Sequence, residues 1–208
     1  GTGWSFDWGA MNQDEFSGVS SWANAFGDSA DQSISSETLV TGQSGGGGSL
    51  RQYNLDRGKG AVQATGQVFY KVTMKRSAAA SWSGLSHMDW GNEVVKFGVP
   101  YDNRATDTIG IEVTGTGENG ITSGTINLAD DTTYTLVCVL DFSNDKVAMF
   151  VNPDSTDYWT ASGNNNADVV RAFPNGNWSS DVRLASGGAT TWDDLVVGTT
   201  AADVGLQD

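Results

Sequence analysis

Short runs of alternating apolar and polar residues recur along this chain, with clusters of Gly, Ser, Thr, Asn and Asp between them. In residues 66–76, Val68, Tyr70, Val72 and Met74 share one face of an extended segment, because successive side chains of a strand point to opposite faces. No segment keeps a helical period for more than about two turns. The pattern therefore predicts an all-β protein of short strands and tight turns. Further strands are predicted at residues 92–99, 107–115, 133–142, 145–153 and 181–186.

The segments between these strands predict how the strands are connected. Residues 133–142 and 145–153 are predicted to form a hairpin that turns at Ser143–Asp145. The glycine-rich run at 44–49 is similar to a flexible linker, but strand-like sequence continues on both sides of it, so a long surface loop is predicted. No break in composition divides the chain. One domain covering residues 1–208 is expected, with two antiparallel sheets packed face to face.

The run Thr-Thr-Trp-Asp-Asp-Leu-Val-Val-Gly near the end of the chain places two acids side by side in a strand-like segment. Strict alternation puts Asp193 on the same face as Leu195, and Asp194 on the same face as Trp192. One of the two carboxylates is then expected to point inward. A buried carboxylate costs several kcal/mol unless a cation or hydrogen-bond donors meet it, so the pattern predicts a positive partner at this strand.

Charge and cysteine content exclude several classes of protein. The chain has 25 acidic and 11 basic residues and a net charge of -14, which argues against nucleic acid and anionic membranes as partners. Such a balance is typical of secreted, salt-tolerant or cation-binding proteins, and the alternative is that the charge serves solubility alone. The single cysteine, Cys138, excludes an intrachain disulfide and is predicted to be a small buried apolar residue. No apolar run approaches about 18 residues, so no membrane span is predicted.

Three segments in sequence order resemble a known family. They are Tyr-Thr-Leu-Val-Cys-Val-Leu-Asp-Phe at 134–142, Val-Ala-Met-Phe-Val-Asn-Pro at 147–153, and Trp-Asp-Asp-Leu-Val-Val-Gly-Thr at 192–199. Together they resemble the laminin-G-like, concanavalin A-like jelly rolls of bacterial secreted proteins, in the lectin and glucanase superfamily. The resemblance implies an antiparallel β-sandwich of jelly-roll type. It does not specify a function, because this fold hosts lectins, adhesion domains, hydrolases and lyases.

The resemblance also implies a structural calcium ion. In many such jelly rolls an Asp on the last strand binds calcium near the N-terminal segment, and the matching position here is Asp193. Backbone carbonyls commonly complete the site, so the N-terminal residues and Gly45–Gly48 are the candidates, and Asp194 is expected to face solvent. The alternative is a strand-entry turn in which both acids are solvated.

No catalytic residue is predicted. Glycoside hydrolases of this fold carry two acids on one strand face, in a Glu-x-Asp-x-Glu pattern, whereas Glu93 and Glu112 have no acid two residues further on. A polysaccharide lyase would need Arg, His and Tyr side chains together. Its candidate residues, whose local motifs do not match known lyase patterns, are Arg51, Tyr53, His87 and Tyr101.

Eight tryptophans suggest contacts with carbohydrate, because the C–H faces of sugars stack on aromatic rings while polar side chains bind the hydroxyls. The alternative for each of them is packing in the core, and Trp4, Trp8, Trp22 and Trp192 are predicted to fill the ends of the sandwich. The predicted ligand-binding residues are Trp82, His87, Trp90, Tyr101, Asn103, Arg104, Trp159 and Trp178.

The sequence as a whole favours a non-catalytic polysaccharide-binding domain stabilised by calcium, in a secreted or cell-surface protein. A catalytic domain in the same polypeptide is a possible partner, since the chain begins without Met and is expected to come from a larger protein. The alternatives are an adhesion domain that binds a protein, or a jelly-roll lyase or hydrolase. The net charge disfavours heavily sulfated glycans unless a basic patch at Arg51, Arg57 and Lys59 offsets it.

Overall fold

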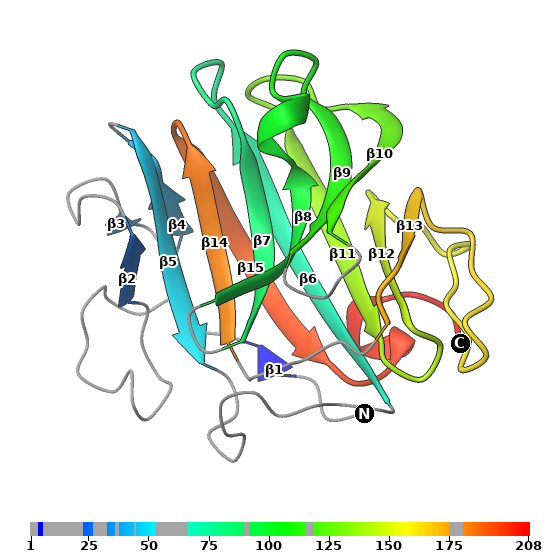
Figure 1. Cartoon of the computed structure of the whole chain (residues 1–208). Helices are drawn as coiled ribbons and strands as arrows, with labels where there is room; N and C mark the ends of the chain where they lie inside the picture. The colour runs from blue at the N-terminus through cyan, green and yellow to red at the C-terminus, as the bar shows by residue number, and fades with distance from the viewer. Residues whose placement is uncertain are drawn as a thin grey trace.

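The structure is a computed structural model. Its described part consists mainly of two antiparallel β-sheets that pack face to face (Figure 1). This arrangement confirms the predicted all-β sandwich. Helical structure among the described residues is limited to two 3₁₀ turns, η3 (Tyr101–Asn103) and η4 (Ala201–Val204), and neither is long or apolar enough to cross a membrane. The described residues are 4–5, 23–26, 33–35, 38–43, 45–52, 66–89, 92–114, 119–174 and 181–208.

The two sheets contain eight and seven strands among the described residues. The first has the order β13-β12-β11-β6-β15-β4-β3, with β1 paired to β15, and the second has the order β10-β9-β8-β7-β14-β5-β2. The eight-stranded sheet consists of β1 (Trp4–Ser5), β3 (Ser33–Ser35), β4 (Thr38–Thr41), β6 (Gln67–Arg76), β11 (Thr133–Asp141), β12 (Lys146–Val151), β13 (Val169–Ala172) and β15 (Thr190–Gly198). The seven-stranded sheet consists of β2 (Ala23–Phe26), β5 (Gly46–Gln52), β7 (Ser83–Asp89), β8 (Asn92–Val99), β9 (Thr108–Val113), β10 (Gly120–Asn127) and β14 (Asp181–Gly187).

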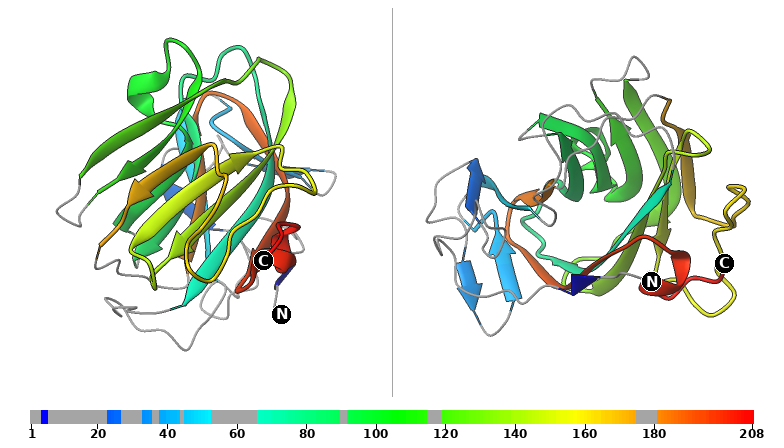
Figure 2. Two further views of the ribbon diagram at one scale, coloured as in Figure 1. Left: turned by 90° about the vertical axis from the view of Figure 1, so that its right-hand side faces the viewer. Right: turned by 90° about the horizontal axis from the view of Figure 1, so that it is seen from below.

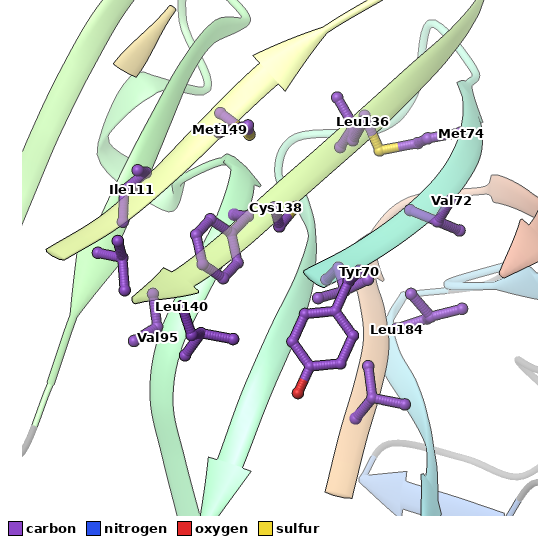
Figure 3. Close-up of a cluster of buried hydrophobic side chains, with 14 of the residues drawn as sticks. Tyr70, Val72, Met74, Val95, Ile111, Leu136, Cys138, Leu140, Met149 and Leu184 are labelled. Atoms are coloured by element: carbon purple, nitrogen blue, oxygen red, sulfur yellow. The ribbon is translucent and has the colours of Figure 1, made fainter. Parts of the chain in front are cut away.

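The main hydrophobic core lies between the sheets and follows the predicted alternation. The inward residues of β6 are the predicted ones, and they are all buried. The predicted hairpin is also present, because β11 pairs with β12 from Leu136 opposite Val151 to Asp141 opposite Lys146. Figure 3 shows part of this core, with labelled side chains from six strands: Tyr70, Val72, Met74, Val95, Ile111, Leu136, Cys138, Leu140, Met149 and Leu184.

Cys138 is fully buried in this core, as predicted, and burial raises the pKa of its thiol well above the usual value. We therefore expect the native protein to be inert to a thiol reagent at pH 8, because the thiolate is the reactive form. Labelling with Ellman's reagent should become stoichiometric only after unfolding in denaturant. Since the chain has one cysteine, rapid labelling of the native protein would contradict this placement.

A second apolar cluster covers the outer face of the eight-stranded sheet. Phe69, Val137 and Phe150 point away from the main core, and the C-terminal segment packs over them through Val204 and Leu206. Figure 2 shows η4 lying against β15 and β6 on this side of the molecule. The outer face of this sheet is therefore partly interior, which the strand alternation did not indicate.

The two acids of β15 sit in a β-bulge, and neither points into the core. Asp193 pairs with Thr73 and Val196 with Lys71, so β15 has one residue more than β6 over this stretch. The extra residue lets Trp192 and Leu195 both face inward, where both are fully buried. Asp193 is half-buried on the outer side, and Asp194 is exposed with a φ of 51°. The prediction that one of the two carboxylates points inward was therefore wrong, because it assumed unbroken alternation.

The glycine-rich run at 44–49 is not the predicted surface loop. Strand β5 begins at Gly46, and its backbone pairs with β14 on one side and β2 on the other. Ladder pairing occupies many carbonyls of this run, and the Gly45 carbonyl accepts a hydrogen bond from the Gly188 N–H at 3.1 Å. Gly46–Ser49 is therefore part of strand β5, and a contribution of these carbonyls to a calcium site stays a prediction.

Candidate functional site

Four connections between strands meet at one end of the sandwich, the upper end in Figure 1. The strand registers place them there: Ser83 of β7 pairs with Val99 and with Ser186, and Thr190 pairs with Arg76 and Thr41. The β4–β5, β6–β7, β8–β9 and β14–β15 connections therefore leave the sheets at the same edge. Trp82 and η3 both lie at this end, because the hairpin of β7 and β8 returns the chain to the edge where β7 begins.

Trp82 immediately precedes β7 and lines an open pocket of about 520 Å³ at this end. The nitrogen-bearing edge of its ring rests on Gly187 and Gly46 of the two neighbouring strands, and a Cβ atom at Gly187 would overlap the ring. The glycine at position 187 therefore makes room for the indole, whereas a Cβ atom at Gly46 would lie in ordinary contact with the ring, at 3.9 Å. The pocket is lined by Gly42, Gln43, Gly45, Gly46, Ala79, Ser81, Trp82, Gly187, Gly188 and Ala189.

A network of charged side chains lies on the outer face of the seven-stranded sheet, next to Trp82. The Lys96 ammonium is 3.3 Å from Glu93 Oε1 and 3.1 Å from Glu112 Oε2. Arg183 Nη2 pairs with Glu93 Oε2, which also accepts a hydrogen bond from Ser86 Oγ at 2.6 Å. Two cations and two anions therefore compensate each other.

Lys96 connects this network to Trp82. Its ammonium lies 5.2 Å from the centroid of the Trp82 ring, a cation–π distance, and its Cγ fills the space above Gly84. The residue is only 8% exposed although it is on the outer face. This network was not predicted from the sequence, because Glu112 and Lys96 become neighbours only through the pairing of β8 with β9. Both residues occupy outward-facing positions of predicted strands, and this position was the signal in the sequence that could have indicated them.

The predicted residues Tyr101, Asn103 and Arg104 lie in the β8–β9 connection at the same end. Tyr101 is 53% exposed, and the Arg104 guanidinium lies 3.8 Å above the centroid of its ring. Asn103 has a structural role, since its Nδ2 donates to the Thr108 carbonyl at 3.1 Å and to Ser123 Oγ at 2.9 Å. The loop thus presents Tyr101 and Arg104 together as a fixed stacked pair.

Two predicted ligand contacts are buried instead. His87 is fully buried between the sheets, where its Nδ1 is 3.0 Å from the Tyr70 hydroxyl and its ring packs edge-on against Phe142. Trp159 is fully buried in the outer cluster, and its Nε1 donates to Asp141 Oδ2 at 2.9 Å. Neither side chain offers surface to a sugar, so both assignments are corrected to core residues.

The remaining predicted residues are only partly described. Trp90, Trp178 and Tyr53 lie outside the described residues, and for Arg51 only the backbone of β5 is described. The lyase set of Arg51, Tyr53, His87 and Tyr101 is not assembled, because His87 is in the core while Tyr101 is exposed at the end of the sandwich. Among the predicted end-filling tryptophans, Trp192 is buried as expected and donates from Nε1 to Thr41 Oγ1 at 2.9 Å.

A calcium ion at Asp193, the predicted ligand, would require about 6–8 oxygen ligands. Strand β1 (Trp4–Ser5) pairs with β15 at Val196 and Val197, so these two residues lie beside the bulge. Asp193 Oδ1 accepts the Asp194 N–H at 2.7 Å. No group of three or more His, Cys, Asp or Glu residues that could hold a metal ion occurs in the described ranges. The described residues thus offer two neighbouring carboxylates, and calcium stays a prediction.

Comparison with known proteins identifies the fold but no family. No protein-family model matches the sequence, and the comparison with curated proteins found no match. Among solved structures, a sialidase superposes with a TM-score of 0.56 at 10% identity, over 96% of this chain and 19% of its own length. The carbohydrate binding module CBM66 from Bacillus subtilis gives a TM-score of 0.55 at 10% identity, covering 91% of this chain and 97% of the module.

Peanut lectin also superposes, with a TM-score of 0.52 at 8% identity, covering 95% of this chain and 97% of the lectin. The chain spans about a fifth of the length of the sialidase, so it corresponds to one part of that protein. At such low identities the likenesses establish the fold alone. They confirm the concanavalin-like jelly roll that the resemblance in the sequence implied.

Proposed function

We propose that this chain is a carbohydrate-binding domain whose ligand contacts Trp82 at the end of the sandwich. The observation that carries the proposal is the position of Trp82, a partly exposed indole supported on Gly187 and Gly46 at the wall of an open pocket. An aromatic side chain beside convergent polar groups in a concave site is typical of sugar binding. The names of two structural neighbours, a carbohydrate binding module and a lectin, support the same proposal. Such a role suits a secreted or cell-surface protein.

We infer a binding role and not a hydrolytic one from the geometry of Glu93 and Glu112. A retaining glycosidase holds the scissile bond between two carboxyl groups about 5–5.5 Å apart. Here the Lys96 ammonium occupies the space between the two carboxylates, at 3.3 and 3.1 Å from them. The sugar's reacting carbon cannot occupy the same position.

The test is co-sedimentation of the purified chain with a panel of insoluble and gelled polysaccharides. Reducing ends and unsaturated products should be assayed in the same tubes. The expected result is retention on at least one polysaccharide without product. Product formation would overturn the non-catalytic role, and a folded protein that binds no glycan in the panel would overturn the proposed function.

A protein partner is a second candidate, favoured by the stacked pair of Tyr101 and Arg104. Tyrosine and arginine are enriched among residues that dominate protein–protein binding energy, and here both are presented by a loop that Asn103 fixes. Pull-down of one defined protein that is lost on Tyr101→Ala, with glycans absent, would support this function. Loss of glycan binding on the same substitution would instead make Tyr101 part of the sugar site.

The calcium prediction is tested through the thermal stability of the chain. We expect the Tm to rise in calcium relative to chelator, because a ligand at about 100 times its Kd stabilises the native state by roughly 2.7 kcal/mol. Asp193→Asn should abolish the difference. Asp194→Asn is the matched control, because it removes a carboxylate at the same bulge and Asn tolerates the positive φ of that position. Equal Tm values in calcium and chelator would remove calcium from the proposed function.

A further inference from the structure

We propose that Glu112, held by Lys96 beside Trp82, makes this surface selective for uncharged, hydroxyl-rich glycans over uronate-containing or sulfated ones. The inference rests on the proposed function and adds the class of ligand to it. It also extends the binding surface from the pocket past Trp82 onto the outer face of the seven-stranded sheet. The charged network on that face determines which glycans can bind along it beyond Trp82.

The cations of the network are already committed to carboxylates. Lys96 contacts Glu93, Glu112 and the Trp82 ring, and its stem is fixed above Gly84. Arg183 pairs with Glu93. An anionic sugar arriving at this face would have to compete with these carboxylates for the same ammonium and guanidinium groups. The network is therefore a poor receptor for anions despite containing two cations.

Glu112 is the member of the network that is best placed to meet a ligand. Its side chain is 25% exposed, against 10% for Lys96 and 18% for Glu93. Its Oε2 is held by Lys96, while three groups converge on Glu93: Lys96, Arg183 and Ser86. Glu112 and Trp82 flank the same ammonium group, so one oligosaccharide can reach both.

The chemistry of a carboxylate acceptor gives the selectivity. Sugar hydroxyls can donate charge-assisted hydrogen bonds to Glu112, which are about twice as strong as neutral ones. A uronate carboxylate or a sulfate ester has no proton to donate at neutral pH, and its charge is repelled by Glu112. The chain's net charge of -14 adds a long-range repulsion of the same sign.

The test compares matched neutral and anionic ligands by isothermal titration calorimetry. Oligosaccharides of glucose, galactose and mannose are each measured beside their C6-oxidised uronate forms, with the wild-type chain at low and physiological salt. We expect the neutral form to bind at least about tenfold more tightly than its uronate form, since each such factor corresponds to roughly 1.4 kcal/mol. This comparison needs no variant, so it tests the selectivity even if a substitution disturbs the fold.

Glu112→Gln then tests the residue. The substitution should weaken binding of the neutral oligosaccharide about tenfold and change the affinity for a monosaccharide much less. The ratio of the affinities for the neutral oligosaccharide and its uronate form should also decrease. Asp130→Asn is the matched control, because it removes the same charge at an exposed position between β10 and β11. Thermal unfolding of both variants should match the wild type.

The outcomes separate the two proposals. Tighter binding of uronates than of neutral glycans, or unchanged binding by Glu112→Gln, would overturn the selectivity while leaving carbohydrate binding in place. Equal effects of Glu112→Gln and Asp130→Asn would assign the discrimination to net charge and overturn the role of Glu112. No binding of any glycan would overturn the proposed function itself.

Discussion

Replacing Trp82 with alanine is expected to reduce the affinity for the bound glycan about 30-fold. Truncation of an aromatic residue at the centre of a binding site typically costs roughly 2 kcal/mol or more, which corresponds to this factor. The ring lines the pocket and has backbone on its supporting side, so its loss removes contact surface that no neighbouring side chain can replace. Calorimetry with the tightest-binding oligosaccharide of the panel measures the effect.

Two further substitutions sharpen this experiment. Trp82→Phe keeps an aromatic face and should lose less affinity than Trp82→Ala. Tyr101→Ala is measured beside them, because Tyr101 lies at the same end of the sandwich but outside the pocket, and a similar loss of affinity would extend the sugar site to the β8–β9 connection. If Trp82→Ala binds as tightly as the wild type, the pocket is not the sugar site.

Replacing Trp159 with alanine is expected to lower the free energy of unfolding by about 3–5 kcal/mol, the usual range for a buried aromatic residue. Trp159 is fully buried against the outer face of the eight-stranded sheet. Its indole also donates to Asp141, a fully buried carboxylate that accepts further hydrogen bonds from Gln67 and Asn144. Urea unfolding followed by circular dichroism measures the change.

Trp159→Phe separates the contribution of apolar burial from that of the hydrogen bond to Asp141. It keeps most of the apolar volume and removes the donor to Asp141, so a smaller loss of about 1–3 kcal/mol is expected. Trp82→Ala is the matched control, because its indole is partly exposed and should contribute much less to stability. A Trp159→Ala variant with wild-type stability and no glycan binding would contradict the burial and restore Trp159 as a sugar contact.

The candidate site was predictable only in part. The sequence identified Trp82, Tyr101 and Arg104, whose positions at one end of the sandwich remain compatible with a ligand-binding role. It could not distinguish Trp82 from Trp159, since both stand among small and polar residues. The difference arises from partners far along the chain: Trp82 rests on Gly187, whereas Trp159 packs beneath the C-terminal segment and against Asp141.

The class of fold, the inward face of β6, the β11–β12 hairpin and the burial of Cys138 and Trp192 could be predicted from the sequence alone. These features follow from alternation within single strands, which is a local property of extended chain. Only the tertiary structure decided the bulge at Asp193, because one inserted residue reverses every face assignment on one side of it. The contacts of Lys96 with Glu112 and Trp82 also became visible only in the tertiary structure. Contacts between strands depend on strand pairing and register, which the sequence of a single strand does not specify.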